Sequence, residues 1–236
     1  SMLKSGKTPL ETYRAMWSAM AQGRVWHGEF INRRKDGSEY TESAIISPVR
    51  SAAGITTHYL AIKQDITEKK KAEAEIHNLA YFDPLTGLPN RRLLMDRLSH
   101  ALIASKRSQF YGALLILDLD NFKTLNDTQG HDVGDRLLVE VALRLTANVR
   151  QEDTVSRLGG DEYVVMLEGL GLEEEVAAKQ AEIIAEKVRL ALAQPYELAG
   201  VEQSHQSSVS IGMTLFHGLE NSTDVLLKQA DVALYQ

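Results

Sequence analysis

The sequence predicts a mixed α/β (α+β) protein with two unequal parts, and three observations support this class. The chain has 236 residues and 44% hydrophobic content, enough to bury at least one full core. Short apolar runs typical of strands alternate with longer stretches in which apolar residues recur at helical spacing. A highly charged stretch separates a shorter, strand-rich part from a longer one. We therefore expect three sections, at residues 1–66, 67–82 and 83–236.

The first section is expected to form a short helix followed by three strands. Turn residues occur at 35–37 and 53–54, and apolar and polar residues alternate over 40–49 and 57–66. This pattern is typical of β-hairpins, so we expect a small antiparallel sheet.

The second section is a candidate helix. Ala72, Ile76 and Leu79 fall at helical spacing, whereas lysines and glutamates occupy the other faces. Two such helices could pair as a short coiled coil that transmits a signal, and a solvated amphipathic linker explains the pattern equally well. Pro84 is expected to stop the helix, because the residue before a proline is pushed out of the α region.

The third section alternates helix and strand, as expected of a sheet packed by helices on its outer side. Helical patterns occur at 91–105, 135–149 and 173–192, and strands are expected at 113–119, 154–158, 163–167 and 208–214. The first of these strands is almost entirely apolar, which is typical of a strand buried inside a sheet.

Two acidic motifs lie at the ends of predicted strands. Gly159 and Gly160 form a tight turn that lets a phosphate approach the backbone, and the adjoining Asp161 and Glu162 offer the hard oxygen ligands that Mg²⁺ prefers. Asp118 lies at the far end of the apolar strand expected at 113–119. Alone, each motif is explained by a solvated hairpin or a strand cap. Together they favour a two-cation site around a triphosphate.

Six ordered blocks make residues 78–236 resemble the GGDEF-domain diguanylate cyclases. The blocks are 83–91, 118–123 with Asn126, 130–135, 159–163, 208–212 and 230–235. Members of this family join two GTP molecules into cyclic di-GMP and release two pyrophosphates. The resemblance implies a central, mainly antiparallel sheet of ferredoxin-like type, related to nucleotidyl cyclases and polymerase palms. Fold alone does not settle the reaction.

The resemblance also implies roles for individual residues. Asp118, Asp161 and Glu162 are expected to bind two Mg²⁺ or Mn²⁺ ions, with Glu162 assisting deprotonation of the ribose 3′-hydroxyl. Lys123 adds a positive charge if its side chain turns inward, and is otherwise solvated. The positions expected to contact the substrate are Asn121, Phe122, Lys123, Gly159 and Gly160.

Two further pairs match guanine-binding positions of the family. Asn126 and Asp135 are expected to recognise the substrate base, because an amide and a carboxylate match the donors and acceptors of guanine. Arg150 and Asp153 occupy the positions of the product-inhibition motif, where cyclic di-GMP would bind away from the active site. Alternatively, Asn126 and Asp135 are helix-cap or turn residues, and residues 150–153 form a polar helix end.

Part of the first section resembles the carboxyl-terminal half of a PAS (PAC) sensor domain. The resemblance rests on residues 26–30, 34–38 and 64–68. The first strands and the helices that wall the ligand cavity of a PAS domain are missing here. We therefore expect a truncated sensor domain in a piece of a longer protein, with a signal ligand that the sequence does not reveal.

Composition and the reaction that the resemblance implies limit the binding partners and the location to be expected. A formal net charge of −6 argues against general binding to DNA or RNA, and the absence of cysteine is compatible with the cytoplasm. No apolar run is long enough to span a bilayer. Because each family domain holds one GTP and each 3′-hydroxyl attacks the other nucleotide, the resemblance implies a homodimer.

Two departures and one rival limit the resemblance. Tyr163 replaces the usual Phe of the signature, and the chain stops at 234–236 before the lysine and basic segment that usually follow. Residues 192–196 are similar to cyclase domains found in tandem with EAL phosphodiesterases. The alternative is therefore a GTP-binding or cyclic di-GMP-binding regulatory domain of a larger GGDEF-EAL protein.

Overall fold

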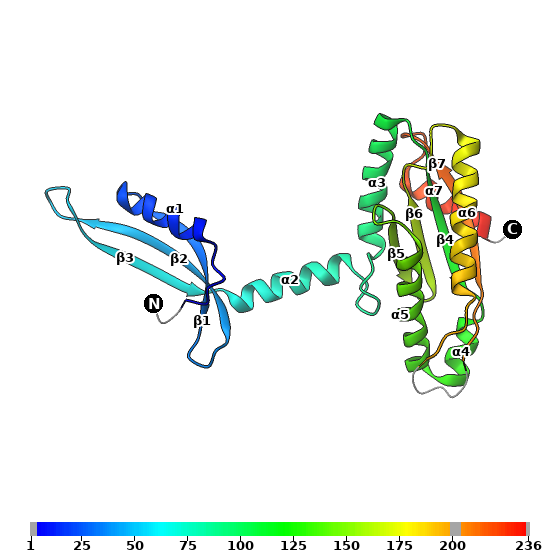
Figure 1. Ribbon diagram of the computed structural model, residues 1–236, viewed down its shortest axis with the longest axis horizontal. Coiled ribbons are helices and arrows are strands. Elements are labelled where there is room, and N and C mark those ends of the chain that lie inside the picture. The colour runs from blue at the N-terminus through cyan, green and yellow to red at the C-terminus, as the bar shows by residue number, and fades with distance from the viewer. Residues whose placement is uncertain (1–3, 199–203, 235–236) are drawn as a thin grey trace. The chain divides into compact units, whose positions relative to one another are not determined.

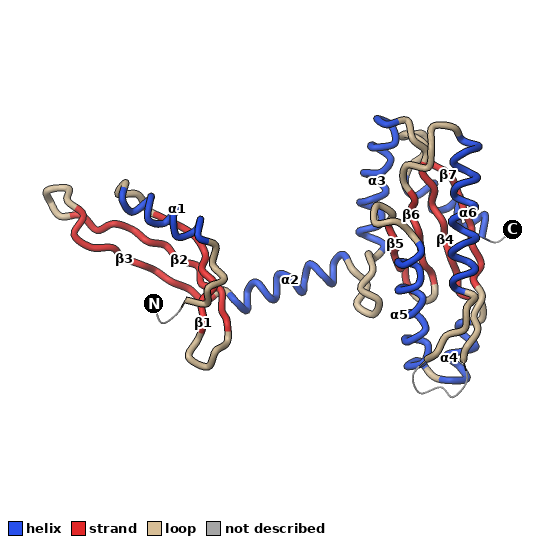
Figure 2. The backbone as a smooth tube through the Cα atoms, in the orientation of Figure 1, coloured by secondary structure: helices blue, strands red, loops and turns tan. Residues whose placement is uncertain are grey.

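A computed structural model describes residues 4–198 and 204–234 of the chain. The chain divides into two compact units, Ser1–His77 and Asn78–Gln236. Helix α2 (Thr67–Tyr81) crosses from one unit to the other (Figures 1 and 2). Each unit has its own sheet and its own hydrophobic core.

The first unit is the expected helix followed by three strands. Helix α1 (Leu10–Ala21) precedes β1 (Trp26–Arg33), β2 (Glu39–Arg50) and β3 (Thr56–Asp65). The strands form an antiparallel sheet in the order β1-β2-β3. The small core between α1 and one face of the sheet contains Ala19, Met20, Trp26, Phe30 and Ala44. This architecture is consistent with a truncated PAS-like piece.

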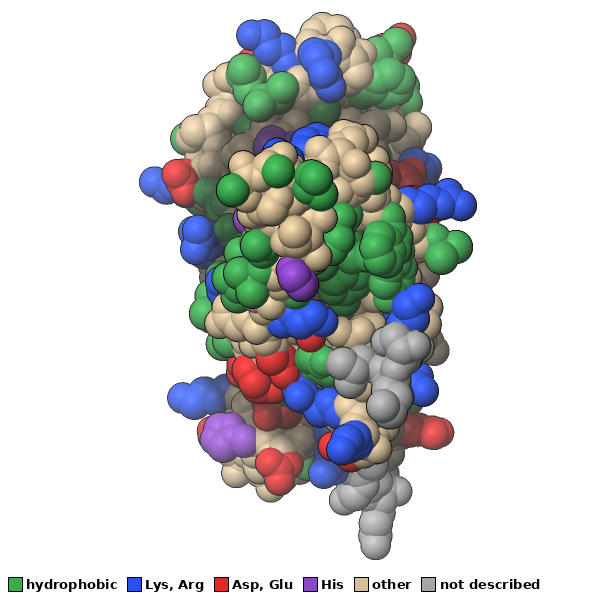
Figure 3. All heavy atoms as spheres, turned by 90° about the vertical axis from the view of Figure 1, so that its left-hand side faces the viewer, with side chains coloured by type: hydrophobic (Ala, Val, Ile, Leu, Met, Phe, Trp, Pro, Cys, Tyr) green, Lys and Arg blue, Asp and Glu red, His purple; other side chains and the backbone are tan. Residues whose placement is uncertain are grey.

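The other face of this sheet carries exposed apolar side chains. Tyr59 points toward α1, since its hydroxyl donates to the Met20 carbonyl at 3.4 Å. Leu60 and Ile62, one and three positions further along, alternate to the opposite face and are 57% and 60% exposed. In the space-filling view of Figure 3, hydrophobic side chains are interspersed with charged and polar ones.

Helix α2 confirms the predicted charged helix. It ends at Tyr81, before Pro84, as the proline predicts. None of its residues is buried, and Ile76 and Leu79 are 66% and 62% exposed. Both interpretations of this helix, a signalling coiled coil and a solvated linker, agree with that exposure.

The second unit is built on a four-stranded sheet in the order β5-β6-β4-β7. The strands are β4 (Gly112–Leu119), β5 (Thr154–Gly159), β6 (Glu162–Leu167) and β7 (Val209–Phe216). All neighbouring pairs are antiparallel, which confirms the expected mainly antiparallel sheet. All four predicted strands are present, within one or two residues at each end.

Five helices accompany this sheet in the part of the unit that the structure describes. They are α3 (Arg91–Ser108), α4 (Phe122–Gln129), α5 (His131–Asn148), α6 (Glu174–Leu192) and α7 (Thr223–Leu234). The three predicted helices are present, although α5 begins earlier than expected, at His131. The periodicity analysis did not predict α4 and α7.

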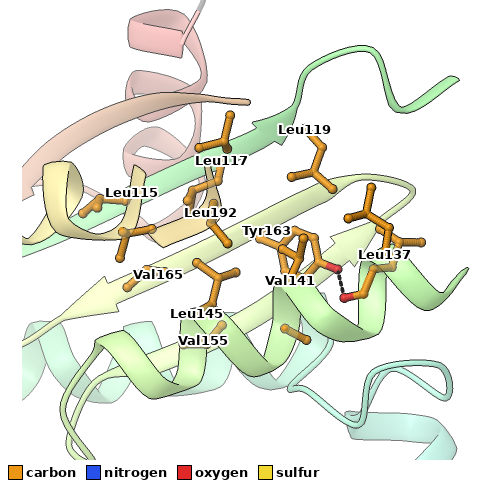
Figure 4. Packing of buried hydrophobic residues seen from close by; sticks show 14 of the residues in the cluster. Leu115, Leu117, Leu119, Leu137, Val141, Leu145, Val155, Tyr163, Val165 and Leu192 are labelled. Carbon is orange, nitrogen blue, oxygen red and sulfur yellow. Dashed lines mark hydrogen bonds between the residues drawn. The ribbon is translucent and has the colours of Figure 1, made fainter. Parts of the chain in front are cut away.

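Helices cover both faces of the sheet, so the expectation of helices on one outer side was wrong. Leu115 and Leu117 of β4 belong to the core formed with α5 and α6 (Figure 4). Leu114 and Ile116 belong to a second core, formed with α3 and α7. The physical reason lies in β4, whose apolar residues on both faces would otherwise be left in water.

Candidate active site

The structure brings the acidic residues of the two strand-end motifs to one end of the sheet. Strands β4 and β6 pair so that Asp118 lies directly opposite Glu162, and Asp161 occupies the adjoining turn. Burial raises the pKa of the Asp118 carboxyl above its ordinary value, and the charges of Asp161 and Glu162 raise it further. The three acids therefore share one region of negative charge, as the sequence predicted.

The donor types suit a hard divalent cation. Carboxylate oxygens such as those of Asp118 and Glu162 are the ligands that Mg²⁺ prefers, and a cation would offset their mutual repulsion. Among residues 4–198 and 204–234, no group of three or more His, Cys, Asp or Glu side chains is arranged to hold a metal ion. The acids thus lie near one another without forming a closed set of ligands.

The glycine hairpin leaves open space beside these acids. Gly159 and Gly160 have φ angles of 150° and 53°, a region that side chains with a Cβ rarely adopt. A Cβ built on either glycine would meet no atom within 4 Å. A phosphate therefore has room to reach the backbone of the turn, and substrate binding at these two positions stays a prediction.

An ion pair that the sequence analysis did not predict supports the hairpin. Arg157 Nη1 lies 2.7 Å from Asp83 Oδ1, and the two side chains are only 10% and 12% exposed. The same guanidinium donates to the Gly160 carbonyl through Nε at 3.0 Å and Nη2 at 2.6 Å. Asp83 begins the first family block and Arg157 lies in the predicted strand just before the glycine turn, yet nothing local indicates that they meet across 74 positions.

Helix α4 begins directly after β4, at the same end of the sheet. Asn121 is its N-cap and adopts the left-handed conformation, with φ of 60°. Phe122 and Lys123 form the first turn, where backbone N–H groups lack intrahelical partners and attract anions. The Lys123 side chain is exposed, so its role in binding phosphate stays a prediction.

Asp120 takes part in a different interaction from that of its neighbour Asp118. Its carboxylate accepts hydrogen bonds from the hydroxyls of Ser208 and Ser210, the latter at 2.8 Å. These contacts join the end of β4 to the start of β7. They give a structural reason for the Ser-Val-Ser block that the sequence analysis singled out.

The two predicted base-recognition residues come to one junction between α4 and α5. Asn126 Oδ1 is buried and has no hydrogen-bond partner among the described residues. It packs against Gly134, where a Cβ would lie 1.9 Å from this oxygen. Asp135, the next residue, is exposed on α5. Gly134 was not predicted as a site residue, although it belongs to a quoted block.

Arg150 and Asp153 form a turn after the end of α5. The Asp153 backbone N–H donates to the Arg150 carbonyl at 3.1 Å, and the Arg150 N–H donates to Asp153 Oδ2 at 2.9 Å. Both residues line a cavity of about 480 Å³. The interpretation of this segment as a helix end was wrong, because α5 ends at Asn148 and the chain turns there.

Tyr163 has a partner for the hydroxyl that distinguishes it from Phe. Its side chain is fully buried, and the hydroxyl donates to the Leu138 carbonyl at 2.8 Å (Figure 4). Burial raises the pKa of this phenol. The substitution is therefore accommodated within the core.

Two other expectations concern the last residues of the chain and membrane-spanning helices. Tyr235, the last residue of the block at 230–235, and Gln236 lie outside the described residues. No helix among the described residues is both long and apolar enough to cross a membrane.

The second unit thus combines a four-stranded antiparallel sheet, acidic residues at the ends of two neighbouring strands, an open glycine turn and a nearby helix N-terminus. A profile of the family described as "Diguanylate cyclase, GGDEF domain" matches residues 80–236. The chain therefore belongs to the GGDEF family.

Curated relatives support the same assignment. The chain is 41% identical over 191 residues to the bifunctional diguanylate cyclase/cyclic di-GMP phosphodiesterase MucR of Pseudomonas aeruginosa, covering 81% of this chain and 26% of MucR. It is 38% identical over 162 residues to the response regulator PleD of Caulobacter vibrioides, covering 67% and 34%. The chain thus spans about a quarter to a third of the length of these relatives.

Solved structures agree with the fold. The GGDEF domain of PA1120 (TpbB or YfiN) from Pseudomonas aeruginosa is 36% identical with a TM-score of 0.60, covering 66% of this chain and 87% of that one. The diguanylate cyclase SiaD of the same organism, solved with its activator SiaC, is 33% identical with a TM-score of 0.60, covering 71% and 62%. The expected GGDEF fold of the second unit is confirmed.

Proposed function

We propose that this protein is a diguanylate cyclase that condenses two GTP molecules into cyclic di-GMP and releases two pyrophosphates. The observation that carries the proposal is the register of β4 and β6, which sets Asp118 opposite Glu162 beside an open glycine turn. Membership of the GGDEF family and similarity to diguanylate cyclases support it.

Charge explains why these acids matter. GTP brings about four negative charges, so a hydroxyl approaching its α-phosphate is repelled unless that charge is neutralised. Two Mg²⁺ or Mn²⁺ ions would supply this neutralisation, held by Asp118, Asp161 and Glu162. Glu162 is the residue we assign to help remove the proton of the ribose 3′-hydroxyl.

The remaining predicted residues position the nucleotide. The N-terminus of α4, at Asn121 to Lys123, faces the phosphates, which its N–H groups can bind. Asn126 and Asp135 meet the guanine base from the junction of α4 and α5. The buried, unpaired Oδ1 of Asn126 supports this role, since such an atom costs free energy unless a partner arrives.

Catalysis also needs a second copy of the domain. Each 3′-hydroxyl attacks the α-phosphate of the other nucleotide, so two domains must face each other as a homodimer. The exposed Ile76 and Leu79 of α2 suit pairing of two such helices, and the first unit would act as the remains of a PAS sensor that controls this pairing. A cytoplasmic location would give the enzyme access to GTP.

Product inhibition is proposed at the turn formed by Arg150 and Asp153. Arg150 can present its guanidinium to the guanine of cyclic di-GMP, while Asp153 accepts from the base donors. The cavity beside both residues supports this assignment.

A regulatory role in a larger protein is the alternative. The similarity to MucR, whose name includes a phosphodiesterase, favours a parent with an EAL domain. The chain is also 32% identical over 171 residues to the cyclic di-GMP phosphodiesterase PdeR of Escherichia coli. In that case the domain would bind GTP or cyclic di-GMP without making product.

The test is incubation of the protein with GTP and Mg²⁺, followed by chromatography for cyclic di-GMP. We expect Glu162→Gln to lower turnover by about 100-fold or more, because it removes charge stabilisation from the transition state. Glu175→Gln, on the exposed first turn of α6, is the matched control and should leave turnover unchanged. A wild-type protein that binds GTP tightly yet forms no product would instead support the regulatory role.

A further inference from the structure

The cavity beside Arg150 and Asp153 contains a third charged residue from a distant element. Its apolar lining includes Val149 and Val155, and Arg97 of α3 also lines it. Arg97 is 53 positions before Arg150 in the sequence, and no motif draws attention to it. The cavity thus has two guanidinium groups on an apolar wall.

A buried hydroxyl holds the Arg97 guanidinium in place. Arg97 Nη1 donates to Thr154 Oγ1 at 3.2 Å, and Thr154 is only 4% exposed. A guanidinium has five N–H donors, so this bond leaves others for a ligand. Within the described residues, Arg97 forms no ion pair at 4.0 Å or less. Its planar fork suits two oxygens of one phosphate group.

The carboxylate of Asp153 in the lining of this cavity favours a guanine base over a bare anion. Asp153 lines the cavity, and its Oδ1 accepts a hydrogen bond from the Glu168 backbone N–H at 3.4 Å. Burial and the charge of Asp153 raise the pKa of the Glu168 carboxyl, whereas the charge of Arg97 lowers it. Free phosphate would meet repulsion here. A nucleotide offers both N–H donors for Asp153 and a phosphate for an arginine.

We propose that Arg97 is a third ligand-binding residue of the product-inhibition site, and that its guanidinium binds a phosphodiester group of the cyclic dinucleotide. Arg150 and Asp153 then bind the guanine, while Val149 and Val155 cover its apolar face. This inference rests on the proposed inhibitory site, and it adds the residue that distinguishes a phosphodiester-linked ligand from a free base.

The experiment measures the dissociation constant of cyclic di-GMP by isothermal titration calorimetry, in the absence of GTP. Arg97→Ala should weaken binding about tenfold, the effect of losing one charge-assisted hydrogen-bonding group. Arg97→Lys should weaken it less, because the charge remains and only the fork is lost. Arg107→Ala, in the last turn of the same helix, is the matched control and should leave binding unchanged.

Salt separates a phosphate contact from a base contact. If Arg97 binds the phosphodiester, the difference between the wild type and Arg97→Ala should shrink as NaCl is raised, because ionic contacts are screened. Thr154→Val keeps the Arg97 guanidinium but removes the hydroxyl that it donates to. This variant should weaken binding by a few-fold, while thermal melting shows that it is folded.

The outcomes distinguish this inference from the proposal beneath it. If Arg150→Ala weakens binding and Arg97→Ala, folded by its melting curve, does not, the inference is wrong and the inhibitory site stands. If neither change affects binding, the inhibitory site itself is wrong. A salt-independent effect of Arg97→Ala would place Arg97 on the base and overturn its assignment to the phosphodiester.

Discussion

The two sheets of this protein differ in how their faces are covered. In the second unit, β4 is buried on both faces, and Leu114 and Leu115 are both 0% exposed. In the first unit, one face packs on α1 and the other leaves Leu60 and Ile62 more than half exposed. The covered sheet fixes the positions of the acids at its end, whereas the open sheet keeps apolar surface available for interaction.

The ion pairs of the two units repeat this difference. Arg157 and Asp83 are almost excluded from water, whereas Lys7 and Glu39 of the first unit are 64% and 33% exposed. A buried pair is costly to break because the remaining charge has no partner, while an exposed charge returns to water. The second unit should therefore be far more sensitive to single substitutions.

The largest expected effect comes from Arg157→Met. Leaving Asp83 buried and unpaired should lower the free energy of unfolding by about 4 kcal/mol, measured by urea denaturation of the second unit's transition. Lys7→Met in the first unit should change it by less than about 1 kcal/mol. Equal effects of the two changes would contradict the contrast between the units.

Leu114→Ala should follow in size. Removing a fully buried side chain from β4 leaves a cavity and should cost about 3 kcal/mol of unfolding free energy. The control, Leu60→Ala on the open sheet face, should change stability by less than about 0.5 kcal/mol. A large loss at Leu60 would show that this face is covered in solution, which analytical ultracentrifugation would then reveal as self-association.

Tyr163→Phe tests the buried hydroxyl. Losing the hydrogen bond to the Leu138 carbonyl should lower the free energy of unfolding by about 1 kcal/mol. Tyr59→Phe removes a longer, partly exposed bond in the first unit and should cost less. Turnover of GTP by Tyr163→Phe should stay near that of the wild type, because the change keeps the aromatic ring and introduces the Phe that is usual at this position.

The smallest expected effects are opposite pH dependences of stability at Asp118 in the second unit and Asp65 in the first. The pKa of Asp118 is raised, so the folded state loses stability as pH rises through 3.8 and the raised pKa above it. Asp118→Asn should therefore melt at a higher temperature than the wild type at pH 7. The two melting temperatures should converge below pH 3.8.

Asp65 of the first unit should behave in the reverse way. Hydrogen bonds from the hydroxyl and backbone of Thr67, with Arg34, lower its pKa from 3.8 to about 2. Its contribution is present above pH 3.8 and is lost as pH falls through about 2. Asp65→Asn should thus lower the melting temperature at pH 7 and approach the wild type only below about pH 2. The same sign for both variants would contradict these assignments.

Much of the fold follows from local patterns. The alternation over 40–49 and 57–66 predicted the hairpin strands, and the apolar run at 113–119 predicted β4. Helix α4 was not predicted, because its eight residues are mostly polar and too few to show a period. Helix α7 was also missed, and so was the covering of the second face of the sheet by α3 and α7, since periodicity shows that a strand is buried but not what covers it.

The sequence by itself determined the acidic motifs, the glycine turn, the strands that carry them and the family to which they belong. Only the tertiary structure decided that Asp118 lies opposite Glu162, that Arg157 meets Asp83, and that Arg97 joins the cavity beside Arg150. The physical reason is that turns and strands depend on neighbouring residues, whereas register and long-range pairs depend on how distant segments pack together.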